Sequence, residues 1–139
     1  MAALTTPIPL GMAAVKATLA AIADGSVHAV INRQGQRLMD GFSEILERRQ
    51  IAARVQGFPA VFHVSLGRRE PIANYRDTLA TDKAAYIRLT GAMLRRGVRA
   101  LERGAWFLSC EHGDDVIDET LNAFDDSLAE AVPPPAREL

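Results

Sequence analysis

The chain has 139 residues, enough for one compact domain but short for a complete cofactor enzyme. Its 16 basic and 17 acidic residues give a formal net charge of −1, so charge favours neither nucleic acid nor an anionic membrane as a partner. The N-terminal sequence lacks the features of a signal peptide, and no apolar run is long enough for a membrane span. A single cysteine, Cys110, excludes an internal disulfide framework, so we expect a soluble, cytoplasmic domain.

Two helices are predicted in the first third of the chain. From Leu10 to Asp24 the sequence is alanine-rich and apolar on nearly every side, which is typical of a largely buried helix ending at Gly25. Ser26 is expected to cap a second helix that is amphipathic. Its apolar stripe contains Val27, Val30, Ile31, Leu38, Phe42, Ile45 and Leu46.

The middle of the chain changes to a strand pattern. β-Branched and aromatic residues between Val55 and Leu66, interrupted by glycine and proline, predict two short strands or one bent strand. A charged loop from Gly67 to Pro71 and a short helix from Ala73 to Leu79 follow.

A longer helix comes next, capped by Thr81 or Asp82 and ended by Gly97 in a left-handed conformation. We predict a hairpin after it, with extended segments at Val98–Leu101 and Ala105–Cys110. The final helix has two aspartates in its first turn, which favour the positive end of the helix dipole. Its apolar positions are Ile117, Leu121, Phe124, Leu128 and Ala131.

This order of elements predicts an α/β domain of the α+β kind, with a small, largely antiparallel sheet and helices packed mainly on one face. The apolar stripes of the second and last helices should contact strand residues such as Phe62, Val64 and Phe107. We assign residues 1–132 to this domain and residues 133–139, which begin with three prolines, to a tail.

Few residues carry an obvious chemistry. The three histidines have no metal-ligand spacing, so we expect no metal site, and Cys110 is interpreted as a buried thiol. Trp106 and Phe107 are interpreted as core residues. Of the three arginine pairs, Arg68-Arg69 is the best placed for an anionic ligand, although a solvated surface pair is the simpler interpretation.

Five stretches follow one another as they do in one enzyme family. Pro9–Ala14 is similar to the second half of a Gly-Asn-Pro-Leu-Ala-Met-Ala-Ala helix start, and Gly35–Leu38 to a Gly-x-x-Leu helix motif. Val55–Phe62 is similar to Val-x-Gly-x-Gly-Ser-Met-Phe, and Met93–Val98 to Leu-Leu-x-x-Gly-Val. Phe107–Asp118 is similar to Ser-x-x-His-x-x-x-Asp-Ile-Asp. From about Pro9 to Ala131 the chain resembles the C-terminal small domain of class III pyridoxal-phosphate (PLP) aminotransferases of fold type I, in the branch of glutamate-1-semialdehyde aminomutase and β-amino-acid transaminases.

The resemblance implies a homodimeric transaminase whose large domain holds the Schiff-base lysine, the pyridine-binding aspartate and the ring-stacking aromatic residue. The threonine that binds the PLP phosphate in the family falls on Leu4 by counting back from Pro9. The adjacent Thr5 is therefore the candidate cofactor-binding residue, one position out of register. Ser109 and His112 are the candidate substrate-cleft residues, and Phe107–Ser109 offers no arginine to clamp a carboxylate.

A Schiff base needs a lysine, and neither Lys16 nor Lys83 lies at a strand-to-loop junction where a cofactor would meet it. The resemblance therefore implies PLP in the complete enzyme, no catalytic residue and no tight PLP binding in this chain, and a large PLP-binding domain or subunit as partner. Two alternatives remain open. One is a stand-alone binding or oligomerisation module with the same fold, and the other is a truncated product without a function of its own.

Overall fold

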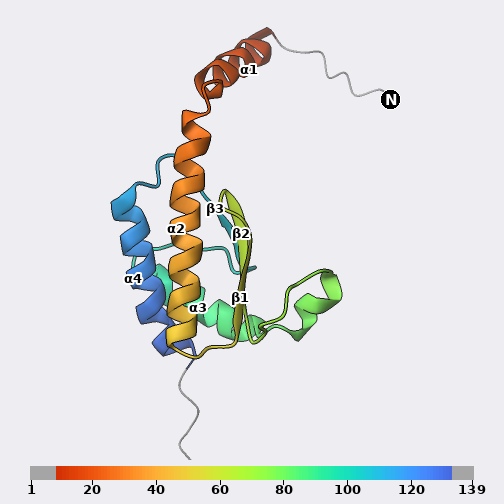
Figure 1. Ribbon diagram of the computed structural model, residues 1–139, viewed down its shortest axis with the longest axis vertical. Helices are drawn as coiled ribbons and strands as arrows, with labels where there is room; N and C mark the ends of the chain where they lie inside the picture. The colour runs from red at the N-terminus through yellow and green to blue at the C-terminus, as the bar shows by residue number, and fades with distance from the viewer. Residues whose placement is uncertain (1–8, 133–139) are drawn as a thin grey trace, which may run out of the picture.

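A three-stranded antiparallel sheet lies at the centre of the computed structural model, which describes residues 9–132 (Figure 1). Its strands are β1 (Ala53–Phe58), β2 (Val61–Leu66) and β3 (Ala105–Phe107), in the order β1-β2-β3. Gly57 lies opposite Phe62, and Val61 lies opposite Phe107. The two strands predicted between Val55 and Leu66 are therefore confirmed.

The strand predicted at Val98–Leu101 is wrong. The Val98 N–H donates to the Met93 carbonyl at 3.0 Å, which closes the end of the preceding helix. The Gly104 carbonyl, in a residue with a φ of 86°, accepts from the Val64 N–H at 2.9 Å. The Gly104 N–H donates to the Leu101 carbonyl at 3.2 Å, so residues 101–104 form a turn, and β3 after it has only three residues.

Three helices cover one face of the sheet, as predicted. They are α2 (Ser26–Arg48), α3 (Lys83–Arg95) and α4 (Asp114–Ala131). A short 3-10 helix, η1 (Tyr75–Ala80), projects on the other side of the sheet from α2 and α4 (Figure 1). Asp82 caps α3 by accepting from the Ala85 N–H at 2.8 Å, and Gly97 has a φ of 86°. Both helix-end predictions are confirmed.

The core is centred on Phe42, which is fully buried. Its ring centroid lies 4.0 Å from that of Phe124, 4.9 Å from that of Trp106 and 6.1 Å from that of Phe62. The predicted packing of α2 against the sheet is therefore confirmed, whereas α4 packs mainly on α2 and α3. Phe107 is the exception, because side chains alternate along β3: Trp106 takes the inner position, and Phe107 is 59% exposed.

The Trp106 indole N–H donates to the Tyr86 hydroxyl at 2.9 Å, so the polar atoms of both aromatic side chains are paired inside the core. Burial raises the pKa of Tyr86 well above its ordinary value.

The first helix, α1 (Pro9–Ile22), extends away from this body (Figure 1). It contains no buried residue, so the predicted burial is wrong within residues 9–132. The axis turns by 67° between α1 and α2, which carries α1 away from the sheet. No single helix in the described part of the chain is long and apolar enough to cross a membrane; α1 and α2 reach those limits only as a bent pair.

The prediction that Ser26 caps the second helix is wrong. Gly25, with a φ of 75°, occupies the N-cap position of α2, and no side chain caps this end. Instead, the Ser26 N–H and hydroxyl donate to Asp24 Oδ1 at 3.0 and 2.8 Å. These bonds hold the turn and lower the pKa of Asp24.

Candidate functional site

The two predicted substrate-cleft residues, Ser109 and His112, lie together in the turn between β3 and α4. The Ser109 N–H donates to His112 Nδ1 at 3.0 Å, and the Glu111 N–H donates to Ser109 Oγ at 3.3 Å. Because Nδ1 accepts, a neutral His112 carries its proton on Nε2. The turn therefore presents one defined imidazole donor.

His112 lines a small hollow of about 250 Å³ beside β3. Leu38, Trp106 and Ile117 form its apolar floor, and Arg99 and Glu119 bring opposite charges to its wall. Cys110 is exposed next to this turn, with Sγ 3.7 Å from Glu111 Oε1, so the predicted buried thiol is wrong. The hollow can hold only a small group, and no nucleophile with an adjacent base lines it.

The two lysines are exposed and lie apart. Lys16 is on α1, and Lys83 is the first residue of α3. Neither lines any of the described hollows. Thr5, the candidate phosphate ligand, and residues 133–139 lie outside the described residues.

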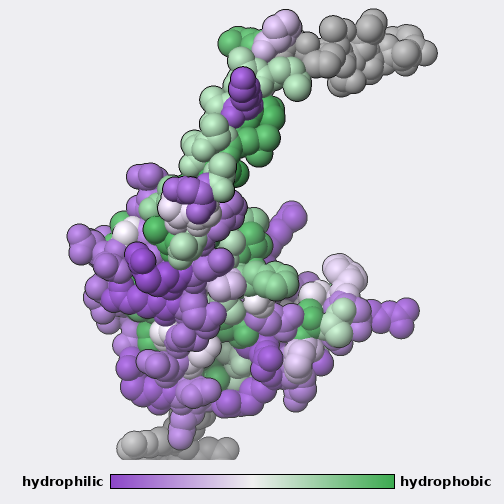
Figure 2. All heavy atoms as spheres, turned by 45° about the horizontal axis from the view of Figure 1, so that its top comes forward, coloured by the Kyte–Doolittle hydropathy of each residue, from purple (hydrophilic) through white to green (hydrophobic). Residues whose placement is uncertain are grey.

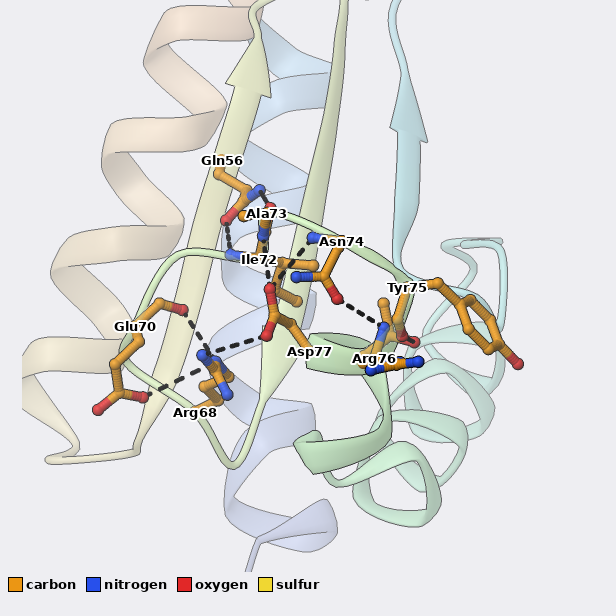
Figure 3. A network of polar contacts seen from close by, with 10 residues as sticks. Gln56, Arg68, Glu70, Ile72, Ala73, Asn74, Tyr75, Arg76 and Asp77 are labelled. Atoms are coloured by element: carbon orange, nitrogen blue, oxygen red, sulfur yellow. Dashed lines mark hydrogen bonds and ion pairs between the residues drawn. The ribbon is translucent and has the colours of Figure 1, made fainter.

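Arg68, in the arginine pair judged best for an anion, is engaged within its own loop (Figure 3). Its guanidinium lies 3.8 Å from Glu70 and 3.7 Å from Asp77. Asp77 also accepts from the Ala73 and Asn74 N–H groups at 2.9 and 3.1 Å, and these bonds, together with Arg68, lower its pKa. Arg68 is thus a structural residue of the η1 loop rather than a free anion ligand.

Gln56 fixes this loop to the sheet. Its side-chain amide donates to the Ile72 carbonyl at 2.9 Å and accepts from the Ile72 N–H at 2.8 Å (Figure 3). Asn74 and Asp77 form a capping box at the start of η1. The Asn-x-x-Asp spacing could have indicated this box in the sequence, whereas the Gln56 contact joins residues sixteen apart and has no local signal.

The other arginine pairs join helices instead of binding ligands. Arg48 and Arg49 contact Asp125 of α4 at 2.7 and 2.5 Å, and Arg95 and Arg96 both contact Glu130 of α4. Arg37 of α2 bridges to Asp114 and Asp118 of α4 at 3.2 and 2.5 Å. The Gln34 amide, and beyond it Arg37, lower the pKa of Asp114.

The face of the sheet opposite the helices carries a continuous apolar row. Phe58, Val61 and Phe107 are cross-strand neighbours in the register of the three strands. They are 80%, 47% and 59% exposed. The sequence interpretation missed this row because it placed Phe107 in the core.

A second apolar surface lies on α1, where hydrophobic residues, in green, predominate in Figure 2. Leu10, Met12, Val15 and Leu19 are each more than half exposed. A 14-residue helix without buried contacts is marginal in water, so this surface indicates a binding partner. Within residues 9–132, no group of histidine, cysteine, aspartate and glutamate side chains could hold a metal ion.

Comparison with known proteins shows similarity to curated enzymes much longer than this chain. It is 32% identical over 125 residues to the glutamate-1-semialdehyde 2,1-aminomutase of Thermoplasma acidophilum, covering 88% of this chain and 29% of that enzyme. The chain thus spans less than a third of the length of this relative. No family model matches the chain.

Solved structures show the same fold. An omega-transaminase from Sphaerobacter thermophilus superposes with a TM-score of 0.67 at 26% identity, over 73% of this chain and 23% of that one. The FumI protein of Sphingopyxis sp. MTA144, in its PLP internal aldimine form, superposes with a TM-score of 0.71 over 86% of this chain and 26% of that one. At 22% identity, the second match is evidence for the fold alone.

Proposed function

We propose that this chain serves as the small domain of a PLP-dependent transaminase. The proposal starts from the similarity just described, by which the chain belongs to the class III aminotransferase family and corresponds to its C-terminal small domain. The complete enzyme would transfer an amino group between an amine or amino acid and a carbonyl acceptor. The domain would comprise residues 1–132, with 133–139 as a tail, in a cytoplasmic homodimer. The partner would be a large PLP-binding domain or subunit, corresponding to the part of the relatives that this chain does not match.

The observation that carries this proposal is the contrast between α1 and the rest of the chain. The body buries its own core, whereas α1 buries nothing and is apolar on nearly every side. An apolar helix with no partner in its own domain is accounted for when a second domain covers it.

The residues that the structure describes, 9–132, do not fit a PLP site by themselves. The cofactor supplies an electron sink when a lysine holds it, but Lys16 and Lys83 are exposed and away from every hollow described. Arg68 is committed to Glu70 and Asp77. We therefore assign cofactor binding to the partner.

The chain would contribute shape and exclusion of water instead. The row of Phe58, Val61 and Phe107 would form an apolar wall over the substrate cleft. Ser109 and His112 would lie at its margin, where the Nε2–H of His112 can donate to a polar substrate group.

Two experiments test the proposal. First, PLP added to the purified chain should give no saturable Schiff-base absorbance, and borohydride should trap no lysine. A single aldimine trapped on Lys16 or Lys83 would place cofactor chemistry in this chain and overturn the assignment.

Second, the chain should form a complex with the Thermoplasma acidophilum aminomutase truncated to remove the region that this chain matches. Leu19→Asp on α1 should abolish the complex. Glu44→Gln is the control and should preserve it, because Glu44 is an exposed residue on α2 rather than on α1. Size-exclusion chromatography measures both. If Leu19→Asp binds as well as the native chain, α1 is not the docking element.

The alternative function, a stand-alone binding or oligomerisation module, is favoured by one observation. Helices α2, α3 and α4 and the sheet close a core without any contribution from α1 or a second domain. Cooperative folding of the purified chain, with no complex with the truncated aminomutase, would favour the module.

A further inference from the structure

The start of α4 is held by a residue of α2 rather than by a cap of its own. Asn74 and Asp82 cap η1 and α3 with their side chains, whereas the N-cap residue of α4 is Gly113, which has no side chain. Instead, the Gln34 side-chain amide donates from α2 to Asp114 Oδ1 at 2.8 Å. A residue eighty positions earlier in the sequence therefore fixes the first residue of α4.

Gln34 is a polar side chain in the core-facing part of α2. The other buried residues of this helix are apolar or glycine. Gln34 is 2% exposed, and its Oε1 has no hydrogen-bond partner within residues 9–132. A buried acceptor without a donor destabilises a fold, whereas an apolar side chain of similar shape would not. What the amide provides, and a leucine could not, is the hydrogen bond to Asp114.

The charge of Asp114 determines which way this amide faces. The Gln34 amide, and beyond it Arg37 and Arg33, lower the pKa of Asp114, so its carboxyl group is ionised at neutral pH. An ionised carboxylate accepts hydrogen bonds and donates none. If the amide turned over, two acceptor oxygens would face each other. Nε2 therefore stays toward Asp114, and the contact has one geometry.

This contact adjoins the turn that carries the candidate site. One residue separates His112 from Asp114, and the Gly113 N–H donates to the Glu111 carbonyl at 3.0 Å. The Ser109 N–H donates to His112 Nδ1 at 3.0 Å, which leaves the proton of a neutral imidazole on Nε2. Because the chain between the two residues is so short, fixing Asp114 also limits the direction in which Nε2–H points.

Arg37 reaches the same carboxylate but is less suited to hold it. Its guanidinium lies 3.2 Å from Asp114 Oδ1, and the two side chains are 40% and 72% exposed. Exposed ion pairs are weakened by water and by salt. The bond from Gln34 begins at a buried amide, where a hydrogen bond is stronger because less water competes for it. Gln34 therefore holds the start of α4 more firmly than Arg37 does.

We propose that Gln34 is a positioning residue for His112: by holding Asp114, it directs the His112 Nε2–H toward the polar substrate group. Gln34 acts through the turn and does not touch the substrate. The role of His112 rests on the proposed function, whereas the orientation of its ring is a property of this chain alone.

NMR of the isotope-labelled, purified chain tests the proposal with Gln34→Leu. At about pH 8, where an ordinary histidine is mostly neutral, His112 should be a single Nε2–H tautomer in the native chain. In Gln34→Leu it should show both tautomers, and the Ser109 amide should exchange with solvent at least about tenfold faster. The urea midpoint should be unchanged or higher, because leucine removes the unpaired acceptor. A lower midpoint with native imidazole signals would show that Gln34 only stabilises the core and would overturn the proposal.

Variants of the exposed Asp114 test the same contact without altering the core. Asp114→Ala should reproduce the changes at His112 and Ser109, and Asp114→Asn should restore the native signals because its amide oxygen can accept from Gln34. Arg37→Gln is the matched control and should change the Ser109 exchange rate by less than about twofold. Native signals in Asp114→Ala, or an effect of Arg37→Gln as large as that of Gln34→Leu, overturns the proposal.

These measurements use neither PLP nor a large domain, so they separate this proposal from the proposed function. A chain that shows the expected changes but does not bind the truncated aminomutase would keep the role of Gln34 in orienting His112 and lose the proposed function. A chain that binds the truncated aminomutase and shows none of the changes would do the reverse.

Discussion

Helices α1 and α2 follow one another in the chain, yet they differ in what stabilises them. Six residues of α2 are buried against the sheet and α4, whereas α1 buries none. The difference lies in the placement of apolar residues, which form one stripe on α2 and cover nearly every side of α1. An amphipathic helix therefore shows where the domain's own core lies, whereas a helix that is apolar on nearly every side can remain outside that core.

Truncation of the residue at the centre of the core should show most clearly how differently α1 and α2 contribute to stability. Phe42→Ala removes a fully buried ring that contacts three other aromatic rings and should lower the free energy of unfolding by about 3 to 5 kcal/mol. Leu19→Ala on α1 should change it by less than about 0.5 kcal/mol. Urea denaturation measures both, and similar losses would show that α1 belongs to the core.

A tight backbone approach should give the next largest effect. Gly35→Ala places a Cβ 2.0 Å from the Pro59 carbonyl oxygen, and the resulting shift should cost about 1 to 3 kcal/mol. Gly41→Ala meets the movable end of the Leu121 side chain and should cost less. Thermal unfolding of the two variants tests this order, and equal midpoints would contradict the packing of α2 on the β1–β2 turn.

The buried polar pair should have a smaller effect. Tyr86→Phe leaves the Trp106 indole N–H without its acceptor and should cost about 1 to 2 kcal/mol. Tyr75→Phe on the exposed η1 arm is the control and should be neutral in the same denaturation experiment. A neutral Tyr86→Phe would mean that the indole finds another acceptor.

The η1 loop is exposed like α1, but hydrogen bonds within the loop hold it in place. It therefore shows what α1 lacks. The Ala73 and Asn74 N–H groups, with Arg68, lower the pKa of Asp77. The ionised Asp77 therefore stabilises the arm above the ordinary aspartate pKa of about 3.9, and this contribution is lost as the pH falls through the lower folded value. The amide proton shifts of Ala73 and Asn74 should stay constant at pH 5 and move only below about pH 4.

In Asp77→Asn, the same two amide signals should show no such titration. A titration that persists in this variant would assign the acid transition to another group.

The sequence predicted the regions in which local pattern and final packing agree. Periodicity and capping act over a few neighbouring residues, so they can be predicted from the sequence. They predicted the apolar stripe of α2, the caps at Asp82 and Gly97, and the last helix. The strand predicted at 98–101 is wrong because Val98 is hydrogen-bonded to the end of α3 and Leu101 to the turn at Gly104.

The site was harder to predict than the fold. Ser109 and His112 are three residues apart, so their hydrogen bond within one turn is a local feature. The apolar row that includes Phe107 depends on which side of a three-residue strand faces the helices, and the sequence places two aromatic residues there side by side.

Hydrogen exchange of the purified chain tests the central claim most directly, namely that α1 is an interface helix attached to a self-contained body. The amides of α2, α3 and α4 should be protected to the level of global unfolding, and those of α1 should exchange almost as fast as in an unfolded peptide. Protection of α1 equal to that of α2, in a chain without a bound partner, would contradict the account.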